Sequence, residues 1–280
     1  MGIKKGDFSK GSVPMHMISI AAPIFLAELV NVTYNIVDRM FIGHIPSSGT
    51  LALSGVGVAF PLISFINAFA GFVSSGGAPL FSITRGEGDD KKAGDILETS
   101  VSFLLLTSLL LMILLFSLMN VVLPIMGADE STFSFAKSYF SIYLLGTPFV
   151  LISLGANPFI TAQGHAVVGM ATVMIGALIN IILDPIFIFV FQWGMMGAAV
   201  ATVMGQIVTA VLAVWYLLNM KIIKPDKGDY RLRGSICRKT LVLGITSFLS
   251  QISLVAAMAA INNMLRKYGA MDAIFGQEQY

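Results

Sequence analysis

Apolar runs of twenty or more residues, separated by short polar segments, make up most of this sequence. A helix formed by such a run is long enough to cross the hydrocarbon core of a bilayer. Only 11% of the 280 residues are charged, whereas a typical soluble domain carries about 25%. We therefore expect an all-α integral membrane protein, which excludes soluble enzymes and disordered chains. The single cysteine, Cys237, excludes an internal disulfide framework.

Seven membrane spans are predicted from the alternation of apolar and polar segments. They lie near residues 15 to 41, 51 to 83, 96 to 120, 133 to 157, 167 to 192, 195 to 219 and 241 to 265. The first span follows three lysines, as the core of a signal peptide would, but it is too long and lacks a small-residue cleavage site. We expect it to be retained as the first helix.

Basic residues lie mainly on one side of this seven-span scheme. That side holds thirteen of the seventeen lysines and arginines, and the other side holds Arg39, Lys137, Arg266 and Lys267. Because cytoplasmic loops attract Lys and Arg, we expect a cytoplasmic N-terminus and a place in the plasma membrane. Residues 221 to 239 hold seven of the basic residues. Between two spans such a cluster indicates an anchor at the membrane surface, not a nucleic-acid partner.

Three acidic residues, Glu28, Asp38 and Asp184, fall within or at the edge of apolar spans. A charge placed in the membrane costs about 2.5 to 3.5 kcal/mol, so it must face a partner or a wet cavity. In the first span Glu28, Asn31, Asn35 and Asp38 stand at offsets 0, 3, 7 and 10, which fall within one stripe of a helix. We expect this stripe to face the interior of the bundle.

A second polar line is predicted in the fifth span, where Thr172, Gly176, Asn180 and Asp184 follow at four-residue steps and precede Pro185. Proline has no N–H and so frees a backbone carbonyl one turn earlier. A free carbonyl beside an acid and an amide suits a cation, which makes Asp38, Asn180 and Asp184 candidate ligands for Na⁺.

Buried carboxyls can also bind and release a proton near neutral pH, depending on whether water or a positive ligand reaches them. Proton or cation exchange at such a site is the chemistry of an antiporter. The alternative is structural: the acids form interhelical hydrogen bonds, and Asp38 caps the outer end of the first helix beside Arg39.

The sixth span carries a line of small residues. Every fourth residue is small, at Gly197, Ala201, Gly205, Thr209 and Ala213. Such a line lets helices pack closely. On the neighbouring line, Thr202 and Gln206 are candidates for a central cavity.

Other motifs argue against enzymatic activity. Gly86-Glu87-Gly88-Asp89 matches the GxGD spelling of intramembrane aspartyl proteases, but it lies in a polar loop. We interpret its Asp89, with Asp90, as charges at the N-terminus of a helix. The three histidines are isolated and no phosphate-binding glycine loop is present. We expect no ATP and no cofactor apart from a coupling ion, H⁺ or Na⁺.

Several stretches together resemble one known family. Residues 27–31 (AELVN), 34–39 (YNIVDR) and 41–43 (FIG) resemble the opening of the MATE (multidrug and toxic compound extrusion) family, particularly its MepA-type members. Residues 85–88 (RGEG), 180–188 (NIILDPIFI) and 197–202 (GAAVAT) resemble it as well, and the NxxLDP part is the most specific.

The resemblance implies twelve helices in two six-helix lobes, with a central cavity that exports cationic drugs in exchange for H⁺ or Na⁺. Carried over by position, it places the cation-coupling site at Asp38, Asn180, Asp184 and Thr202, with Tyr34 adjoining. It places Glu28 and Asn31 at the cavity, where the polar lines described above also place Asn35 and Gln206.

On this basis we expect a six-helix transporter lobe plus the first helix of a second lobe. Residues 1–14 are then a cytoplasmic N-terminus, 15–219 the first lobe, 220–240 a cytoplasmic linker and 241–280 the first helix of an incomplete second lobe. The expected partners are cationic drug-like substrates, the lipid bilayer and a missing C-terminal lobe. Two alternatives to multidrug efflux stay open: a lipid-linked or polysaccharide flippase of the same superfamily, and a truncated, non-transporting membrane protein.

Overall fold

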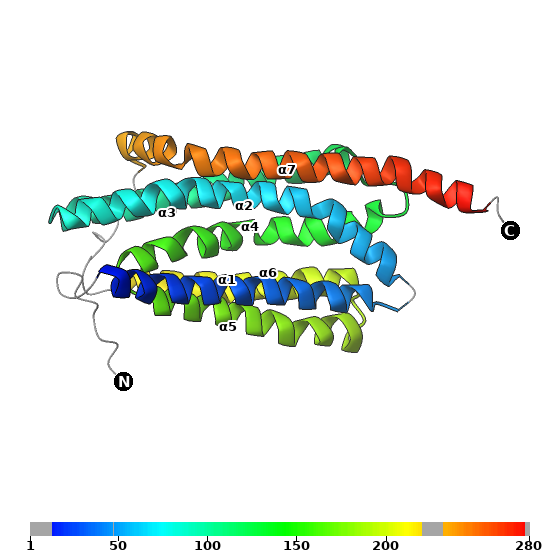
Figure 1. Ribbon diagram of the computed structural model, residues 1–280, viewed down its shortest axis with the longest axis horizontal. Helices are drawn as coiled ribbons and strands as arrows, with labels where there is room; N and C mark the ends of the chain where they lie inside the picture. The colour runs from blue at the N-terminus through cyan, green and yellow to red at the C-terminus, as the bar shows by residue number, and fades with distance from the viewer. Residues whose placement is uncertain (1–12, 47, 220–231, 278–280) are drawn as a thin grey trace.

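The computed structural model describes residues 13–46, 48–219 and 232–277, and this part of the chain is a bundle of long antiparallel helices (Figure 1). The helices are α1 (Val13–Gly43), α2 (Gly49–Gly86), α3 (Asp90–Ile125), α4 (Phe133–Ala162), α5 (Ala166–Pro185), the short π-helix η1 (Ile186–Val190), α6 (Met195–Leu218) and α7 (Gly234–Gln277). Seven of the described helical segments are long and apolar enough to cross a membrane. The all-α membrane fold is thus confirmed.

Several helices extend beyond the predicted spans. Helix α3 begins at Asp90 instead of near residue 96, because the side chain of Asp89 accepts a hydrogen bond of 3.0 Å from the N–H of Lys92 and caps the helix. Helix α7 begins at Gly234, inside the predicted linker 220–240, and ends at Gln277 instead of near residue 265. The apolar run marks only the part of a helix that matches lipid, whereas backbone hydrogen bonding continues through the polar interface.

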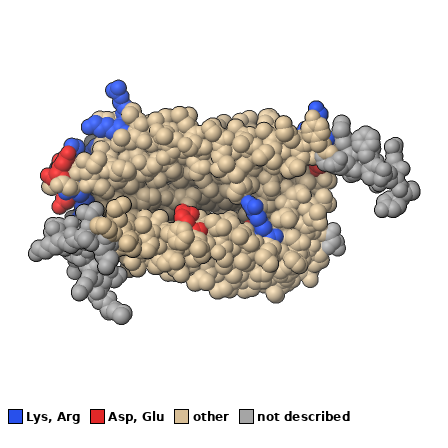
Figure 2. Space-filling view, in the orientation of Figure 1, with Lys and Arg blue, Asp and Glu red and all other residues tan. Residues whose placement is uncertain are grey.

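The bundle has two ends that differ in charge. The basic end holds the α2–α3 turn (residues 87–89), the α4–α5 turn (residues 163–165) and the start of α7. The distal end holds the α3–α4 turn (residues 126–132) and the η1–α6 turn (residues 191–194). Most charged side chains in Figure 2 gather at the ends, and the flank between them carries few charges, which lie along a central hollow.

Helix α4 lies at the centre of the bundle, packed against α2 on one side and α6 on the other. Phe81 of α2 and Phe159 of α4 are fully buried and meet edge to face, with their ring centroids 5.7 Å apart. Aromatic pairs of this geometry add to the free energy gained by burial alone. The arrangement fixes α2, α4 and α6 as the frame on which the other helices are placed.

The small-residue line of α6 lies where this helix packs on α5. A methyl group added at Gly176 of α5 would lie 2.0 Å from Thr209 Oγ1, and one at Gly205 of α6 would lie 2.7 Å from the Gly176 carbonyl oxygen. Only small residues permit this separation. The predicted packing function of the line is therefore confirmed.

Helix α7 lies along α2 and also contacts α3. A methyl group added at Gly76 would lie 1.9 Å from the Thr240 carbonyl oxygen, and one at Gly244 would lie 2.0 Å from the Phe72 carbonyl oxygen. The backbones of α2 and α7 are thus in direct contact near the basic end. At the distal end, α7 is held by side-chain hydrogen bonds, as described in the Discussion.

Candidate functional site: a polar groove between α1 and α2

A groove of about 700 Å³ runs along the bundle between α1 and α2, and α4, α5 and α6 contribute to its floor. It is open on one flank, where Figure 2 shows a long hollow with acidic and basic atoms along it. Pockets that hold drug-sized ligands have volumes of about 300 to 1,000 Å³. The groove is therefore large enough for a small organic molecule.

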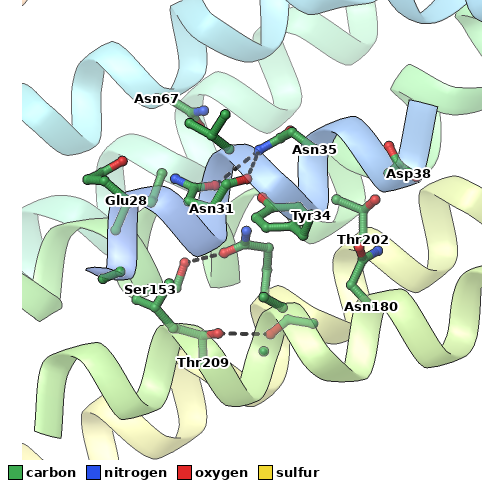
Figure 3. A pocket seen from close by; sticks show the side chains of 18 of the residues that line it. Glu28, Asn31, Tyr34, Asn35, Asp38, Asn67, Ser153, Asn180, Thr202 and Thr209 are labelled. Atoms are coloured by element: carbon green, nitrogen blue, oxygen red, sulfur yellow. Dashed lines mark hydrogen bonds between the residues drawn. The ribbon is translucent and has the colours of Figure 1, made fainter. Parts of the chain in front are cut away.

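The polar stripe of α1 lines this groove. Glu28 is exposed, Asn31 and Asn35 are half-buried, and Asp38 is only 6% exposed. Asn35 Nδ2 donates hydrogen bonds to the Asn31 carbonyl oxygen (2.7 Å) and to Asn31 Oδ1 (3.1 Å), so these two side chains are held within their own helix (Figure 3). The four positions predicted from the sequence thus all face the groove.

At the distal end of the groove, Asp38 of α1 faces Asp184 of α5. Asp184 is fully buried behind the groove wall, and the two carboxyls lie within hydrogen-bonding reach of each other. Asn180 Nδ2 donates to Asp184 Oδ1 over 3.3 Å. Asp38 is also well inside α1, which ends at Gly43. The alternative in which Asp38 merely caps this helix is therefore wrong.

Three buried oxygens of this cluster have no hydrogen-bond partner among the described residues: Asp38 Oδ1, Asn180 Oδ1 and Asp184 Oδ2. A buried acceptor left unpaired costs about 1 to 3 kcal/mol, and more if it is charged. A proton shared by the two carboxyls reduces this cost for Asp38 and Asp184, because two close carboxylates cannot both stay ionised cheaply. A Na⁺ ion bound by the three oxygens removes it, so these residues fit either ion.

Hydroxyl and amide groups surround the carboxyl pair. Tyr139 Oη lies 3.4 Å from Thr202 Oγ1, and Tyr34 forms a side-chain hydrogen bond with Gln206. Asp38, Thr202 and Asn180 lie together in Figure 3, with Tyr34 beside them and Glu28 well away along α1. The predicted coupling residues are thus brought together, and the predicted cavity residues extend from them toward the basic end.

Helix α4 supplies a wall of the groove that the sequence analysis missed. Ser153 Oγ donates to Gln206 Oε1 over 2.5 Å, and Tyr143 Oη donates to Asn67 Oδ1 over 3.3 Å. The sequence does contain a pattern that could have predicted this wall. Four polar residues of the fourth span share one helical face: Tyr139, Tyr143, Ser153 and Asn157. Without a carboxylate among them, these residues did not stand out.

The backbone changes at Pro185, directly after the buried Asp184. Helix α5 ends there and continues as the π-helix η1, in which the Phe191 N–H donates to the Ile186 carbonyl over 2.9 Å. A proline cannot donate to the preceding turn, and short π-helices are frequent at functional sites. The predicted span from 167 to 192 is therefore interrupted at this proline, and the interruption places the carboxyl pair at the end of the regular helix.

A multi-pass helical bundle with a polar groove that ends at a buried carboxyl pair is typical of membrane transporters. Comparison with known proteins agrees with this class. The MatE family model matches residues 23–186, more than half of the chain, and the chain therefore belongs to the MatE family. The resemblance noted in the sequence is confirmed.

The chain is also similar in sequence to known multidrug export proteins. The multidrug export protein MepA of Staphylococcus haemolyticus is 25% identical over 270 residues, which are 94% of this chain but only 58% of the relative. This chain thus spans a little over half of that relative's length.

Solved structures share the fold. One is an outward-facing multidrug resistance MATE family transporter of the MOP superfamily, which matches with a TM-score of 0.83 at 24% identity. The match covers 92% of this chain and 57% of that chain. Another is a MOP superfamily transporter from Pyrococcus furiosus, with the same TM-score, identity and coverage, described by a reversed polarity of its binding pocket. These relatives are transporters and not enzymes, and the chain is a multi-pass membrane protein.

Proposed function

We propose that this chain is part of a cation-coupled multidrug exporter of the plasma membrane, in which H⁺ or Na⁺ binds at Asp38, Asn180 and Asp184. The observation that carries the proposal is the set of three buried oxygens on these residues that lack partners among the described residues. Thr202 and Tyr34 adjoin this coupling site. Binding of the ion relieves the repulsion between the two carboxylates and repacks α1, because Asp38 lies where α1 packs against α5.

The exported substrate in this proposal is a cationic, drug-like compound. Glu28 supplies an exposed negative charge in the groove, while Asn31, Asn35 and Gln206 supply adaptable hydrogen-bonding groups. A large pocket with few fixed polar groups accepts varied ligands. Binding of the ion at the distal carboxyl pair and loss of the substrate are linked, since both depend on the position of α1.

Efflux of ethidium from cells tests this function. The gene is expressed with any sequence encoded after Tyr280, as wild type and as Asp38→Asn, Asp184→Asn and Asp90→Asn. We expect efflux in the wild type, its loss in the first two variants, and no change in Asp90→Asn, which removes an exposed carboxyl at the basic end. Unchanged efflux in both Asp38→Asn and Asp184→Asn contradicts the coupling site. Collapsing the pH gradient or the Na⁺ gradient separately identifies the ion.

A flippase for lipid-linked or polysaccharide substrates is the second candidate. The Pyrococcus furiosus transporter has the same fold with a pocket of reversed polarity, and the groove here also contains Arg39. Absence of ethidium efflux in the wild type, with the protein present in the membrane, favours this candidate. No movement of either substrate class favours a non-transporting protein.

The proposed topology has the basic end in the cytoplasm, as thirteen of seventeen basic residues suggest. The only cysteine provides a probe, because Cys237 is partly exposed in the first turn of α7 at the basic end. A membrane-impermeant maleimide should label it only after the cells are permeabilised. A cysteine placed at Ser131, exposed in the distal α3–α4 turn, should be labelled in intact cells of a Cys237→Ser background.

A further inference from the structure

Two exposed charged side chains lie along the groove wall formed by α1. Glu28 and Arg39 both line the groove and both are exposed. They are eleven residues apart, which corresponds to about 16 Å along a helix. Glu28 lies toward the basic end, and Arg39 lies toward the distal end, next to the carboxyl pair of Asp38 and Asp184. The proposed function uses Glu28 but gives no part to Arg39.

Arg39 crosses the groove to an aromatic ring on the opposite helix. Its guanidinium carbon lies 4.7 Å from the centroid of the Phe60 ring of α2. Phe60 is half-buried and itself lines the groove. Helices α1 and α2 otherwise make little contact with each other. This cation–π contact is therefore a bridge across the groove close to its distal end.

Aromatic rings line the same part of the groove, since Tyr34, Tyr139 and Tyr143 lie near the carboxyl pair. The face of an aromatic ring attracts an organic cation for the same reason that it attracts a guanidinium, namely the negative charge of its π face. A cationic ligand that occupies the Phe60 face must displace Arg39 and approach its positive charge. Specificity built on such an internal repulsive element is common in proteins.

We propose that Arg39 is a specificity-determining residue that competes with organic cations for the Phe60 face. The proposal rests on the proposed function, because it assumes that organic cations enter this groove. Arg39 weakens the binding of a cation at the distal end of the groove and so favours its release there. Neutral ligands do not compete for the ring in this way, and their affinity does not depend on Arg39.

Equilibrium binding to the purified full chain in detergent tests the proposal, with ethidium as the probe and fluorescence polarisation as the readout. We expect Arg39→Gln to bind ethidium about three- to tenfold more tightly, the range that a cation–π contact and a nearby like charge account for. Arg39→Lys keeps the positive charge and should bind as the wild type does. In the double variant Arg39→Gln/Phe60→Leu the gain should disappear.

Lys137→Gln is the matched control. Its ammonium lies 5.7 Å from the Phe133 ring centroid, also at the distal end, but Lys137 does not line the groove. This variant removes the same charge and a similar contact, and its affinity for ethidium should not change. Thermal unfolding of every variant checks that the protein is folded. We expect the Arg39 variants to fold, because Arg39 is exposed.

The outcomes separate this inference from the proposed function. Equal affinity in the wild type and Arg39→Gln overturns the inference and leaves the proposed function in place. An equal gain in Lys137→Gln also overturns it, because the effect is then general electrostatics. If the double variant Arg39→Gln/Phe60→Leu still binds ethidium more tightly than the wild type, the Phe60 ring is not the site of competition. Absence of ethidium binding in all folded variants overturns both the inference and the export of cations.

Discussion

Helices α1 and α7 both lie at the margin of the bundle and expose many apolar side chains, but they are held in different ways. Helix α7 is in direct backbone contact with α2 through Gly76 and Gly244. Helix α1 packs mainly on α5 and reaches α2 through the contact between Arg39 and Phe60. One helix is fixed by its backbone, and the other is placed by side chains that also line the groove.

Hydrogen bonds reinforce this difference at the distal end. Asn262 Nδ2 donates to the carbonyls of Gly57 (3.1 Å) and Met126 (3.3 Å), and Asn263 Nδ2 donates to that of Ile125 (2.8 Å). Arg266 Nη1 donates to the Ala128 carbonyl over 3.1 Å. Apart from the bond to Gly57, which belongs to α2, these contacts satisfy carbonyls at and just after the C-terminal end of α3, where a cation is also favourable.

The polar side chains of α1 are satisfied in another manner. Thr33 Oγ1 donates to the Leu29 carbonyl over 2.7 Å, and Asn35 bonds to Asn31, so both bonds stay within the helix. These internal bonds are kept when α1 shifts relative to its neighbours, whereas the contacts of Tyr34 with Gln206 and of Asp38 with Asp184 must rearrange. We conclude that α1 can repack around the groove at lower cost than α7 can leave α2.

The largest effect is expected from Gly76→Val. A side chain at this position meets the Thr240 carbonyl oxygen at 1.9 Å, and neither backbone can yield without separating α2 from α7. We expect a loss of about 3 kcal/mol or more in the free energy of unfolding, measured by thermal or denaturant unfolding in detergent. Gly71→Val is the control, since a methyl group there meets nothing within 4 Å. Equal losses in both variants contradict a special contact at Gly76.

A smaller effect is expected from the double variant Asn262→Leu/Arg266→Met. It keeps the approximate size of both side chains but removes the donors to the carbonyls of Gly57, Met126 and Ala128, which water satisfies only in part. We expect a loss of about 1 to 2 kcal/mol in the free energy of unfolding. Lys267→Met is the control, because Lys267 is exposed and its ammonium contacts the neighbouring Tyr268 ring. A double variant as stable as this control shows that the distal bonds do not hold α7.

The smallest effect on stability is expected in the α3–α4 turn, whose Ala128 carbonyl accepts the hydrogen bond from Arg266. Asp129 Oδ1 accepts hydrogen bonds from Thr132 Oγ1 (2.7 Å), the Thr132 N–H (2.8 Å), Ser131 Oγ (2.8 Å) and the Ser131 N–H (3.1 Å). The bond from the Thr132 side chain is the main cause that lowers the pKa of the Asp129 carboxyl below its ordinary value. Because the folded-state pKa is depressed, the stabilisation is present above the unfolded pKa, about 3.9, and is lost as pH falls through the folded value.

Unfolding measured from pH 6 down to about pH 3 tests this turn. We expect the wild type to be more stable than Asp129→Asn at pH 6 by less than about 1 kcal/mol, because Asp129 is exposed and water screens its interactions. The difference should shrink as the pH falls toward the acidic end of the range. A difference that grows as pH falls contradicts the assigned direction of the pKa shift.

The comparison of α1 and α7 also shows where prediction from sequence succeeds. Apolar length predicted every membrane helix, because each must satisfy its own backbone hydrogen bonds in lipid. The spacing of Glu28, Asn31, Asn35 and Asp38 predicted the groove-facing side of α1, because helical geometry fixes which residues share a face. The positions at which α3 and α7 begin were wrong, since capping and interfacial turns do not depend on hydropathy.

The acidic residues of the candidate site were predicted from the sequence, but the polar residues of α2 and α4 that line the groove were not. Asp38 and Asp184 stand out because charge is costly in lipid. Tyr143, Ser153 and Asn67 do not, because single hydroxyl and amide groups are common in membrane helices and gain meaning only from their neighbours. Their contribution to the groove depends on how α2 and α4 cross, which no local pattern specifies.

The sequence by itself determined that this is a multi-pass helical membrane protein of the MatE family, with acids on the inner faces of the first and fifth helices. The membrane helices and their inner faces depend on composition, length and helical period, which are local, whereas the family was indicated by the resemblance of short motifs. Only the tertiary structure decided that Asp38 meets Asp184, that Arg39 reaches Phe60, and that α7 is fixed to α2. These contacts join residues 21 to 172 positions apart, and the packing of whole helices is what brings them together.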